Sequence, residues 1–347
     1  MVFTRLGVMI VGAFAIVVLV GGFAHSRNAP FSRTSPALPV EEKWRDEIEK
    51  RGAVGAYEEL AKIVEDKSVN EKHKEAHAFG AALFASEGAG GLSVCDSRFS
   101  FGCFHEFLGT AIPALGIGSI HELNDACYAD LTESPLSCQH GIGHGVLAAY
   151  GYDDVALRDS LEACRSLKQK DPIGGCYGGV FMEYNVRTML GDEGHLRAFT
   201  GNRFDPCDAL DDAFVPACIY WLPQWWIEIE PADIPHRRDR FTKFGEYCRE
   251  FASEPETRRA CFEGLGNIVA DYSNFDPVAA HSYCKAAGTQ PAERLLCIGI
   301  GANHFGLSVS AEAAAQMCEN LTGEELSYCS AYARNEANVA FTRPLPL

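Results

Sequence analysis

The sequence has 347 residues, of which 47% are hydrophobic, and it carries a formal net charge of -17 at pH 7. Such an apolar content is typical of a chain that buries a substantial core, so an intrinsically disordered protein is excluded. The acidic balance disfavours nucleic acid as a partner. The absence of a phosphate-binding glycine-rich loop and of a Gly-x-Ser-x-Gly elbow disfavours nucleotide-binding and serine hydrolase functions.

The N-terminal segment is the first predicted element. An apolar run of 19 residues extends from Leu6 to Ala24 between Arg5 and Arg27, which is long enough to span a bilayer. We therefore predict a signal anchor within residues 1–28, and the alternative is a cleaved signal peptide. Both interpretations export the rest of the chain. The anchor would make the membrane a partner and place the bulk of the protein outside the cytoplasm, in a periplasm or an extracellular space.

Beyond the anchor, the sequence predicts a linker, one long domain and a tail. Residues 29–40 are rich in Pro, Ser and Arg and have no apolar period, which is typical of a linker. From Glu41 onward apolar residues recur at helical intervals, and strand signals are nearly absent. We expect a helical-hairpin repeat domain over residues 41–341 and a short tail over 342–347.

The 14 cysteines define the repeat. They fall into neighbouring pairs separated by 8 to 13 positions, and the second members of successive pairs are 32 to 43 residues apart, the period of a two-helix unit. No Cys-x-x-Cys occurs, so structural disulfides in an oxidising compartment are favoured over zinc ribbons or redox motifs. The predicted pairs are Cys95 with Cys103, Cys127 with Cys138, Cys164 with Cys176, Cys207 with Cys218, Cys248 with Cys261, Cys284 with Cys297, and Cys318 with Cys329.

Each pair is expected to staple one helical hairpin at its turn. The upstream cysteine ends one helix, a loop of turn residues follows, and the downstream cysteine opens the next helix. An eighth hairpin without cysteines is predicted before the others, because the segment from His73 to Phe84 resembles the segment that begins at His140. The predicted fold is all-α, with the stapled hairpins forming an α/α toroid or an α-solenoid.

Two resemblances support this architecture. The stretch from Cys95 to Gly109, CDSRFSFGCFHEFLG, resembles one unit of the cysteine-rich Sel1-like repeat proteins, which implies an exported, disulfide-stapled solenoid with a binding role. The other six units have longer loops between their cysteines and lack the Leu-Gly signature. The openings HGIGHG, EGLG and IGIG are similar to inner-helix starts of α/α-toroid proteins of the lanthionine-synthetase C type, a likeness of architecture alone.

A metal site is predicted around the motif His140-Gly-Ile-Gly-His144. Two imidazoles at positions i and i+4 share a helix face and can chelate one cation, and His73 and His77 repeat the spacing. The flanking glycines indicate that the helices approach one another or a ligand closely. The predicted ligands of a zinc or other first-row divalent ion are His77, His105, His140 and His144, with Glu106 and Glu183 as candidate catalytic bases. The alternative is that these histidines pack between helices and hydrogen-bond to loop carbonyls.

Other polar side chains recur at the same register after the second cysteine of each pair and would line a common face. These candidate ligand-binding residues are Tyr220, Gln224, Asn267, Asn303, His304, Asn335 and Glu336. The tryptophans near Tyr220 are interpreted as core packing, with a stacking wall for a ligand as the alternative. Two functions are predicted. The first is a metal-dependent protein that binds a small molecule, peptide or envelope component and acts on it by hydrolytic or Lewis-acid chemistry. The alternative is a non-enzymatic Sel1-like interaction scaffold.

Overall fold

The computed structural model describes residues 39–129, 135–169, 171, 173–191, 194–229, 234, 236–252 and 254–334, all within one unit of the chain, Phe31–Leu347. The predicted anchor at residues 1–28, most of the linker and the tail at 342–347 lie outside these described residues. No helix in the described part is both long and apolar enough to cross a membrane.

The described residues form α-helices joined by turns and short 3-10 helices, without a β-sheet. We call the helix that carries the second cysteine of a pair an anchor helix. The anchor helices are α3 (Gly102–Leu115), α5 (Pro135–Tyr150), α7 (Cys176–Asn185), α8 (Val215–Ile229), α10 (Pro255–Tyr272), α12 (Pro291–Ser308) and α14 (Gly323–Ala333). The other elements are α1 (Pro39–Ile63), α2 (Val69–Glu87), α4 (Ile120–Ala129), α6 (Asp154–Arg165), α9 (Arg237–Phe251), α11 (Pro277–Ala287), α13 (Ala311–Met317), η1 (Gly88–Val94), η2 (Arg98–Phe101), η3 (Ile117–Ser119) and η4 (Cys207–Ala209).

The seven predicted disulfides are confirmed. The bonds join Cys95 to Cys103, Cys127 to Cys138, Cys164 to Cys176, Cys207 to Cys218, Cys248 to Cys261, Cys284 to Cys297, and Cys318 to Cys329. The bonded Cα atoms are 5.4 to 5.7 Å apart. All 14 half-cystines are buried in one continuous apolar core that extends from Trp44 in α1 to Cys329 in α14. Seven structural disulfides indicate an oxidising, extracytoplasmic compartment.

The position of the second cysteine within its helix differs from the prediction. Among the anchor helices, α7 alone opens with its cysteine, Cys176. The other anchor helices begin upstream of their cysteines, which are Cys103, Cys138, Cys218, Cys261, Cys297 and Cys329. In α10 and α12 the reason is a proline in the first turn, Pro255 and Pro291, whose fixed φ suits a helix start. Residues that were expected to belong to the turn therefore form the first turn of the anchor helix.

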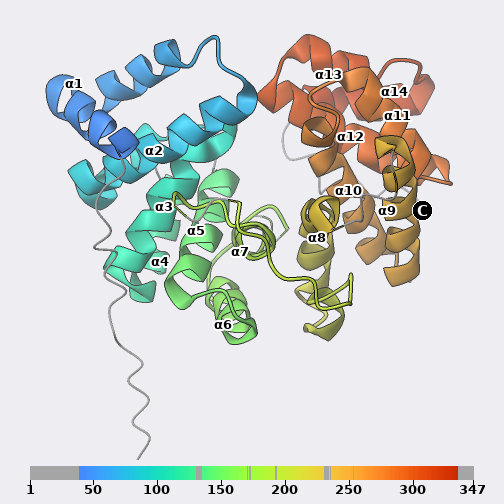
Figure 1. Ribbon diagram of the computed structural model, residues 1–347, viewed down its shortest axis with the longest axis horizontal. Coiled ribbons are helices and arrows are strands. Elements are labelled where there is room, and N and C mark those ends of the chain that lie inside the picture. Colours follow the sequence, from blue (N-terminus) through green and yellow to red (C-terminus); the bar gives the residue numbers. More distant parts are fainter. Residues whose placement is uncertain are drawn as a thin grey trace, which may run out of the picture. The chain divides into compact units, whose positions relative to one another are not determined.

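The anchor helices pack on one another in chain order, and α2 precedes them as the first member of this row (Figure 1). Each of them contacts the next, from α2 through α3, α5, α7, α8, α10 and α12 to α14. The helix before an anchor helix packs back on it, as α4 does on α5 and α11 on α12. Helices α1 and α2 form the predicted hairpin without cysteines. The all-α repeat fold is therefore confirmed.

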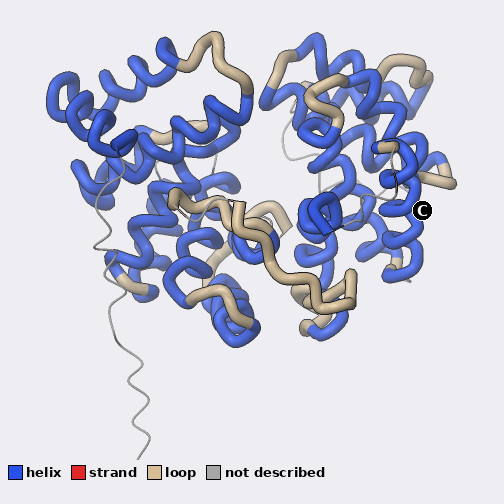
Figure 2. The backbone as a smooth tube through the Cα atoms, in the orientation of Figure 1, coloured by secondary structure: helices blue, strands red, loops and turns tan. Residues whose placement is uncertain are grey.

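The fourth stapled unit departs from the hairpin pattern. Between α7 and α8 lies a long loop, drawn in tan in Figure 2, and Cys207 lies in the short helix η4 rather than at the end of an α-helix. The segment has no helical apolar period, and Gly191, Gly194 and Gly201 all adopt positive φ. These glycines favour turns over a helix. We call residues 186–206 the α7–α8 loop.

Parts of the described array that are far apart in sequence also meet. Helix α12 contacts η2, and the hydroxyl oxygens of Ser100 and Ser308 are 3.2 Å apart across 208 positions of sequence. This hydrogen bond joins the turn before the first anchor helix to the last residue of the sixth. The row of anchor helices thus turns back toward its own beginning.

Candidate metal centre

Five histidines from three helices that are neighbours in the packed row gather in one cluster. His73 and His77 come from α2, His105 from α3, and His140 and His144 from α5. Helix α3 packs against both α2 and α5, so His105 lies between the two pairs. Its ring centroid is 5.4 and 5.6 Å from those of the α2 pair and 5.4 and 4.7 Å from those of the α5 pair. Four of the rings are at most 6% exposed, and His73 is half-buried.

Glycines let the histidine-bearing helices approach closely, as the sequence predicted. A Cβ on Gly141 or Gly145 would collide with carbonyl oxygens of α3, at Phe104 and Leu108 respectively. A Cβ on Gly143, on the other side of α5, would collide with the carbonyl oxygen of α7 at its first residue. Helix α5 is therefore clamped between α3 and α7, and its glycines are required by close packing rather than by backbone conformation.

The turn before α3 fixes the orientation of the first histidine. Phe99, Ser100 and Phe101 all have positive φ, between 52° and 65°, so the chain turns sharply before α3 begins. The turn aims the Phe99 carbonyl oxygen at the Nδ1 atom of His73, 2.9 Å away. At Gly102, the first residue of α3, an added Cβ would lie 2.8 Å from the backbone oxygen of His73.

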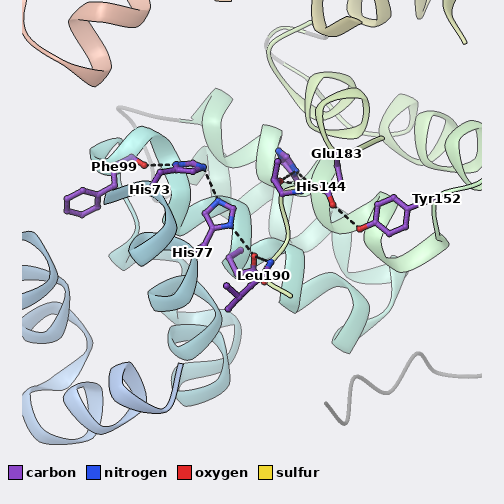
Figure 3. A network of polar contacts seen from close by, with 9 residues as sticks. His73, His77, Phe99, His144, Tyr152, Glu183 and Leu190 are labelled. Atoms are coloured by element: carbon purple, nitrogen blue, oxygen red, sulfur yellow. Dashed lines mark hydrogen bonds and ion pairs between the residues drawn. The ribbon is translucent and has the colours of Figure 1, made fainter. Parts of the chain in front are cut away.

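A buried carboxylate holds the second histidine of α2. The Nδ1 atom of His77 donates to Oε2 of Glu106, 3.2 Å away, and the same oxygen accepts the backbone N–H of Leu190 at 2.7 Å. The Nε2 atom of His77 lies 3.0 Å from Nε2 of His73, so the two rings of α2 face each other (Figure 3).

A second buried carboxylate holds the second histidine of α5. The Nδ1 atom of His144 donates to Oε2 of Glu183 at 3.0 Å, and the Tyr152 hydroxyl donates to Oε1 at 2.9 Å (Figure 3). The backbone N–H and the hydroxyl of Thr188 also donate to Oε2, at 2.9 and 2.6 Å. The Nδ1 atom of His140 donates to the backbone oxygen of Gly174, 3.1 Å away.

Two nitrogen atoms of the cluster stand out because they are buried without a hydrogen-bond partner. They are Nδ1 of His105 and Nε2 of His144. In four of the five histidines Nδ1 is bonded to a carbonyl or a carboxylate, which leaves Nε2 to face the cluster. Metal-binding histidines show the same pattern, in which an outer acceptor fixes the tautomer and orientation of the ring.

The cluster contains two groups of three imidazoles that could hold a metal ion. One is His73, His77 and His105, and the other is His105, His140 and His144. Within each group one nitrogen from each ring lies within 4.8 Å of the others. Tetrahedral zinc with bonds of about 2.0–2.1 Å keeps its ligands about 3.4 Å apart, so small side-chain movements suffice. The structure thus brings together all four predicted metal ligands. It adds His73, whose spacing from His77 was the available signal.

Electrostatics keep three of the rings neutral. Burial, reinforced by the neighbouring His77, lowers the pKa of His73 to about 3. Burial and the nearby His144 hold the pKa values of His105 and His140 well below their usual range. Neutral imidazole is the form that binds a metal.

The two predicted bases lie behind the imidazoles rather than beside an open position. Glu106 and Glu183 are at most 1% exposed, and each accepts from the Nδ1 atom of a histidine. Burial acts to raise the pKa of Glu183, but hydrogen bonds from His144 and Thr188 hold it below its usual value. Sequence reasoning did not find Thr188 or Leu190, because their backbone N–H groups carry no residue signature.

Among the predicted ligand-binding residues of the later helices, His304 and Asn267 are in contact. The Nδ1 atom of His304 donates to the backbone oxygen of Asn267 at 2.7 Å, and the side-chain amide of Asn303 donates to the backbone oxygen of Tyr332 at 3.1 Å. Tyr220 is buried, and burial holds its pKa well above the usual value. None of these residues belongs to the five-histidine cluster, although His304 is close enough to His73 to lower its pKa. Gln224 is half-buried in α8, and Asn335 and Glu336 lie outside the described residues.

The tryptophans of α8 divide between core and cluster. Trp225 and Trp226 are completely buried and donate to carbonyl oxygens of the α7–α8 loop, at Arg197 and Arg203, which confirms the core interpretation for both. Trp221 is half-buried, and its ring centroid lies 4.9 Å from that of His140. An aromatic face therefore borders the histidine cluster on the α8 side.

Comparisons with protein-family models, with curated proteins and with solved structures found no match to this chain.

Proposed function

We propose that this protein is an exported metalloprotein in which His105, His140 and His144 bind one divalent first-row ion, zinc or copper. The observation that carries the proposal is the pair of unpartnered nitrogens in this group, Nδ1 of His105 and Nε2 of His144. A buried polar atom without a partner costs about 1–3 kcal/mol. A cation coordinated by these rings would remove that cost, and three imidazoles are a suitable ligand set for zinc or copper.

The chemistry that such an ion would supply is Lewis-acid activation. A site with three protein ligands keeps a position for a substrate group or for water, which suits hydrolytic reactions. Trp221, which borders His140, offers an aromatic face beside that position for a small molecule, a peptide or a component of the cell envelope.

Glu106 and Glu183 enter this proposal as positioning residues. Each accepts from an Nδ1 atom and so keeps the Nε2 lone pair of its histidine toward the cluster. Their role as general bases stays a prediction, because a base must also reach the proton that it removes.

We further propose that the predicted helix within residues 1–28 tethers the domain to the outer side of a membrane. The 19-residue apolar run supports the tether, and the seven disulfides agree with an extracytoplasmic position for the domain.

Metal analysis of the purified full-length chain tests the proposed function. After exposure to Zn²⁺ and removal of loosely bound ions, the wild type should retain stoichiometric zinc. The double variant that combines His140→Ala and His144→Ala should lose the ion of this group. His121→Ala is the matched control, because His121 is an exposed histidine of α4 and its removal should change nothing.

A wild type without stoichiometric metal would overturn the metalloprotein and leave the non-enzymatic interaction scaffold. Metal content unchanged in the double variant would move the site elsewhere. Circular dichroism of the variants separates loss of ligands from loss of fold.

A further inference from the structure

The other three-histidine group, on the α2 side of His105, has a geometry that calls for its own cation. The Nε2 atoms of His73 and His77 lie 3.0 Å apart, within hydrogen-bonding distance. Whether that distance is favourable depends on which of the two nitrogens carries a proton, and the outer partners of both rings decide this.

His73 must donate from Nδ1. Its partner there is the Phe99 backbone oxygen, 2.9 Å away, and a carbonyl oxygen only accepts. A neutral imidazole has a single N–H, so Nε2 of His73 carries a lone pair.

His77 is held in the same tautomer. Oε2 of Glu106 already accepts the backbone N–H of Leu190 and faces Nδ1 of His77 at 3.2 Å. A carboxylate in this position accepts the Nδ1 proton, and Nε2 of the neutral ring is again a lone pair. Two lone pairs then face each other at 3.0 Å, which is repulsive unless a positive charge lies between or beside them.

His105 completes the surroundings of that charge. Its ring lies between the two pairs, and one of its nitrogens is within 4.8 Å of a nitrogen from each ring of the α2 pair. Neutral His105 has a single lone pair, so it can serve two ions only as an imidazolate, after its remaining N–H proton has been released to water, and each of its two nitrogens then binds one ion. Among the described residues, the α2 pair contacts the ring of His105, the Phe99 backbone oxygen and the carboxylate of Glu106. His144 and His304 are close enough to His73 to lower its pKa.

We propose that His73, His77 and His105 bind a second divalent first-row ion, so that the cluster is a two-metal centre with His105 between the ions. This inference rests on the proposed function for the group of His105, His140 and His144. Zn²⁺ and Cu²⁺ are the ions that the imidazole set suits.

Zinc stoichiometry of the full-length protein tests the second site. The wild type should bind two ions per chain. His73→Ala should bind one, and His73→Gln should also bind one, because the longer amide keeps a donor for Phe99 but is a poor zinc ligand. His144→Ala should keep the ion of the α2 side, and His121→Ala should still bind two.

Copper provides a readout that does not depend on counting. With two equivalents of Cu²⁺, the wild type should give an electron paramagnetic resonance spectrum that shows magnetic coupling between neighbouring ions. His73→Ala should give the spectrum of isolated Cu²⁺. Thermal melting of each variant checks that the fold is retained, and the wild-type stoichiometry is informative even where a variant unfolds.

The outcomes separate this inference from the function on which it rests. The second site is overturned if the wild type binds one ion, which His144→Ala loses and His73→Ala retains. The charge between the α2 rings is then a proton on His77. No stoichiometric ion in the wild type overturns both proposals. Two ions with uncoupled copper spectra would overturn the shared role of His105.

Discussion

Single glycines set the distance between the helices that carry the histidines. Gly143 faces the first residue of α7, where even a methyl group would overlap the Cys176 carbonyl oxygen. The packing penalty there opposes the usual gain of helix propensity on replacing glycine with alanine.

We predict that Gly143→Ala lowers the free energy of unfolding by about 1–3 kcal/mol, the usual cost of overpacking. Gly55→Ala, in α1, is the matched control, because its new Cβ would meet only the side chain of Arg51. That variant should be neutral or slightly more stable. Urea unfolding measures both, and a stable Gly143→Ala protein would contradict the close approach of α5 and α7.

Glu263 is a buried group whose charge affects stability. Burial, opposed in part by Arg259, raises its pKa from 4.5 to about 7. The folded state therefore holds a proton between those pH values that the unfolded state releases, so stability falls as the pH rises through this window.

We predict that Glu263→Gln becomes more stable than the wild type as the pH rises from 4.5 to 7, by up to about 3 kcal/mol. The glutamine oxygen can still accept from Nε of Arg259, which donates to the native carboxylate at 2.8 Å. Glu246→Gln, at an exposed position of α9, should show no such trend. Urea unfolding below and above this pH window gives the difference, and equal differences on both sides would refute the buried-charge argument.

At the scale of elements, the α7–α8 loop replaces a partner helix and supports the cluster. Its backbone supplies the N–H of Leu190 to Glu106 and the N–H of Thr188 to Glu183. Met189, between them, is fully buried against Gly109 of α3. The loop thereby fixes both carboxylates that orient histidines, and a regular helix would satisfy its own N–H groups instead.

We predict that Thr188→Val lowers the affinity of the His105, His140 and His144 group for Zn²⁺ about 10-fold, the lower end of the usual outer-partner effect. The change removes the hydroxyl that donates to Glu183 at 2.6 Å and preserves side-chain shape. Thr200→Val, at an exposed position in the same loop, is the control. Competition with a zinc chelator measures both, and equal affinities would exclude a supporting role for the Thr188 hydroxyl.

Across the whole molecule, the disulfides act locally while the core is continuous. Each bond closes a loop of 8 to 13 positions at a single turn, and all the half-cystines belong to one apolar cluster. A loop of this size contributes about 2–3 kcal/mol in the chain-entropy account. Seven such contributions exceed the usual net stability of a domain, so the reduced chain should unfold readily.

We predict that mass spectrometry of non-reduced peptides finds each cysteine linked to its sequence neighbour, and that reduction under native conditions unfolds the domain. Circular dichroism before and after reduction measures the second effect. Links between different hairpins would contradict the repeat, and a reduced protein with unchanged melting would show that the core alone is sufficient.

The sequence by itself determined the features that depend on neighbours along the chain. Cysteine pairing is one, because the partners are at most 13 positions apart and the turn between two helices brings them together. The register of the histidines is another, since the spacing of His140 and His144 places both on one face of α5. The glycines around them predicted close packing for the same local reason.

Only the tertiary structure decided which of these residues meet. His73 joins the cluster because the turn at Phe99 lies against α2, and Glu106 is held by an N–H 84 positions away. Backbone donors and carbonyls have no signature in the sequence, and the packing order of the helices sets which faces adjoin. The cluster therefore has five histidines, four of them around a central His105, where spacing alone indicated separate pairs.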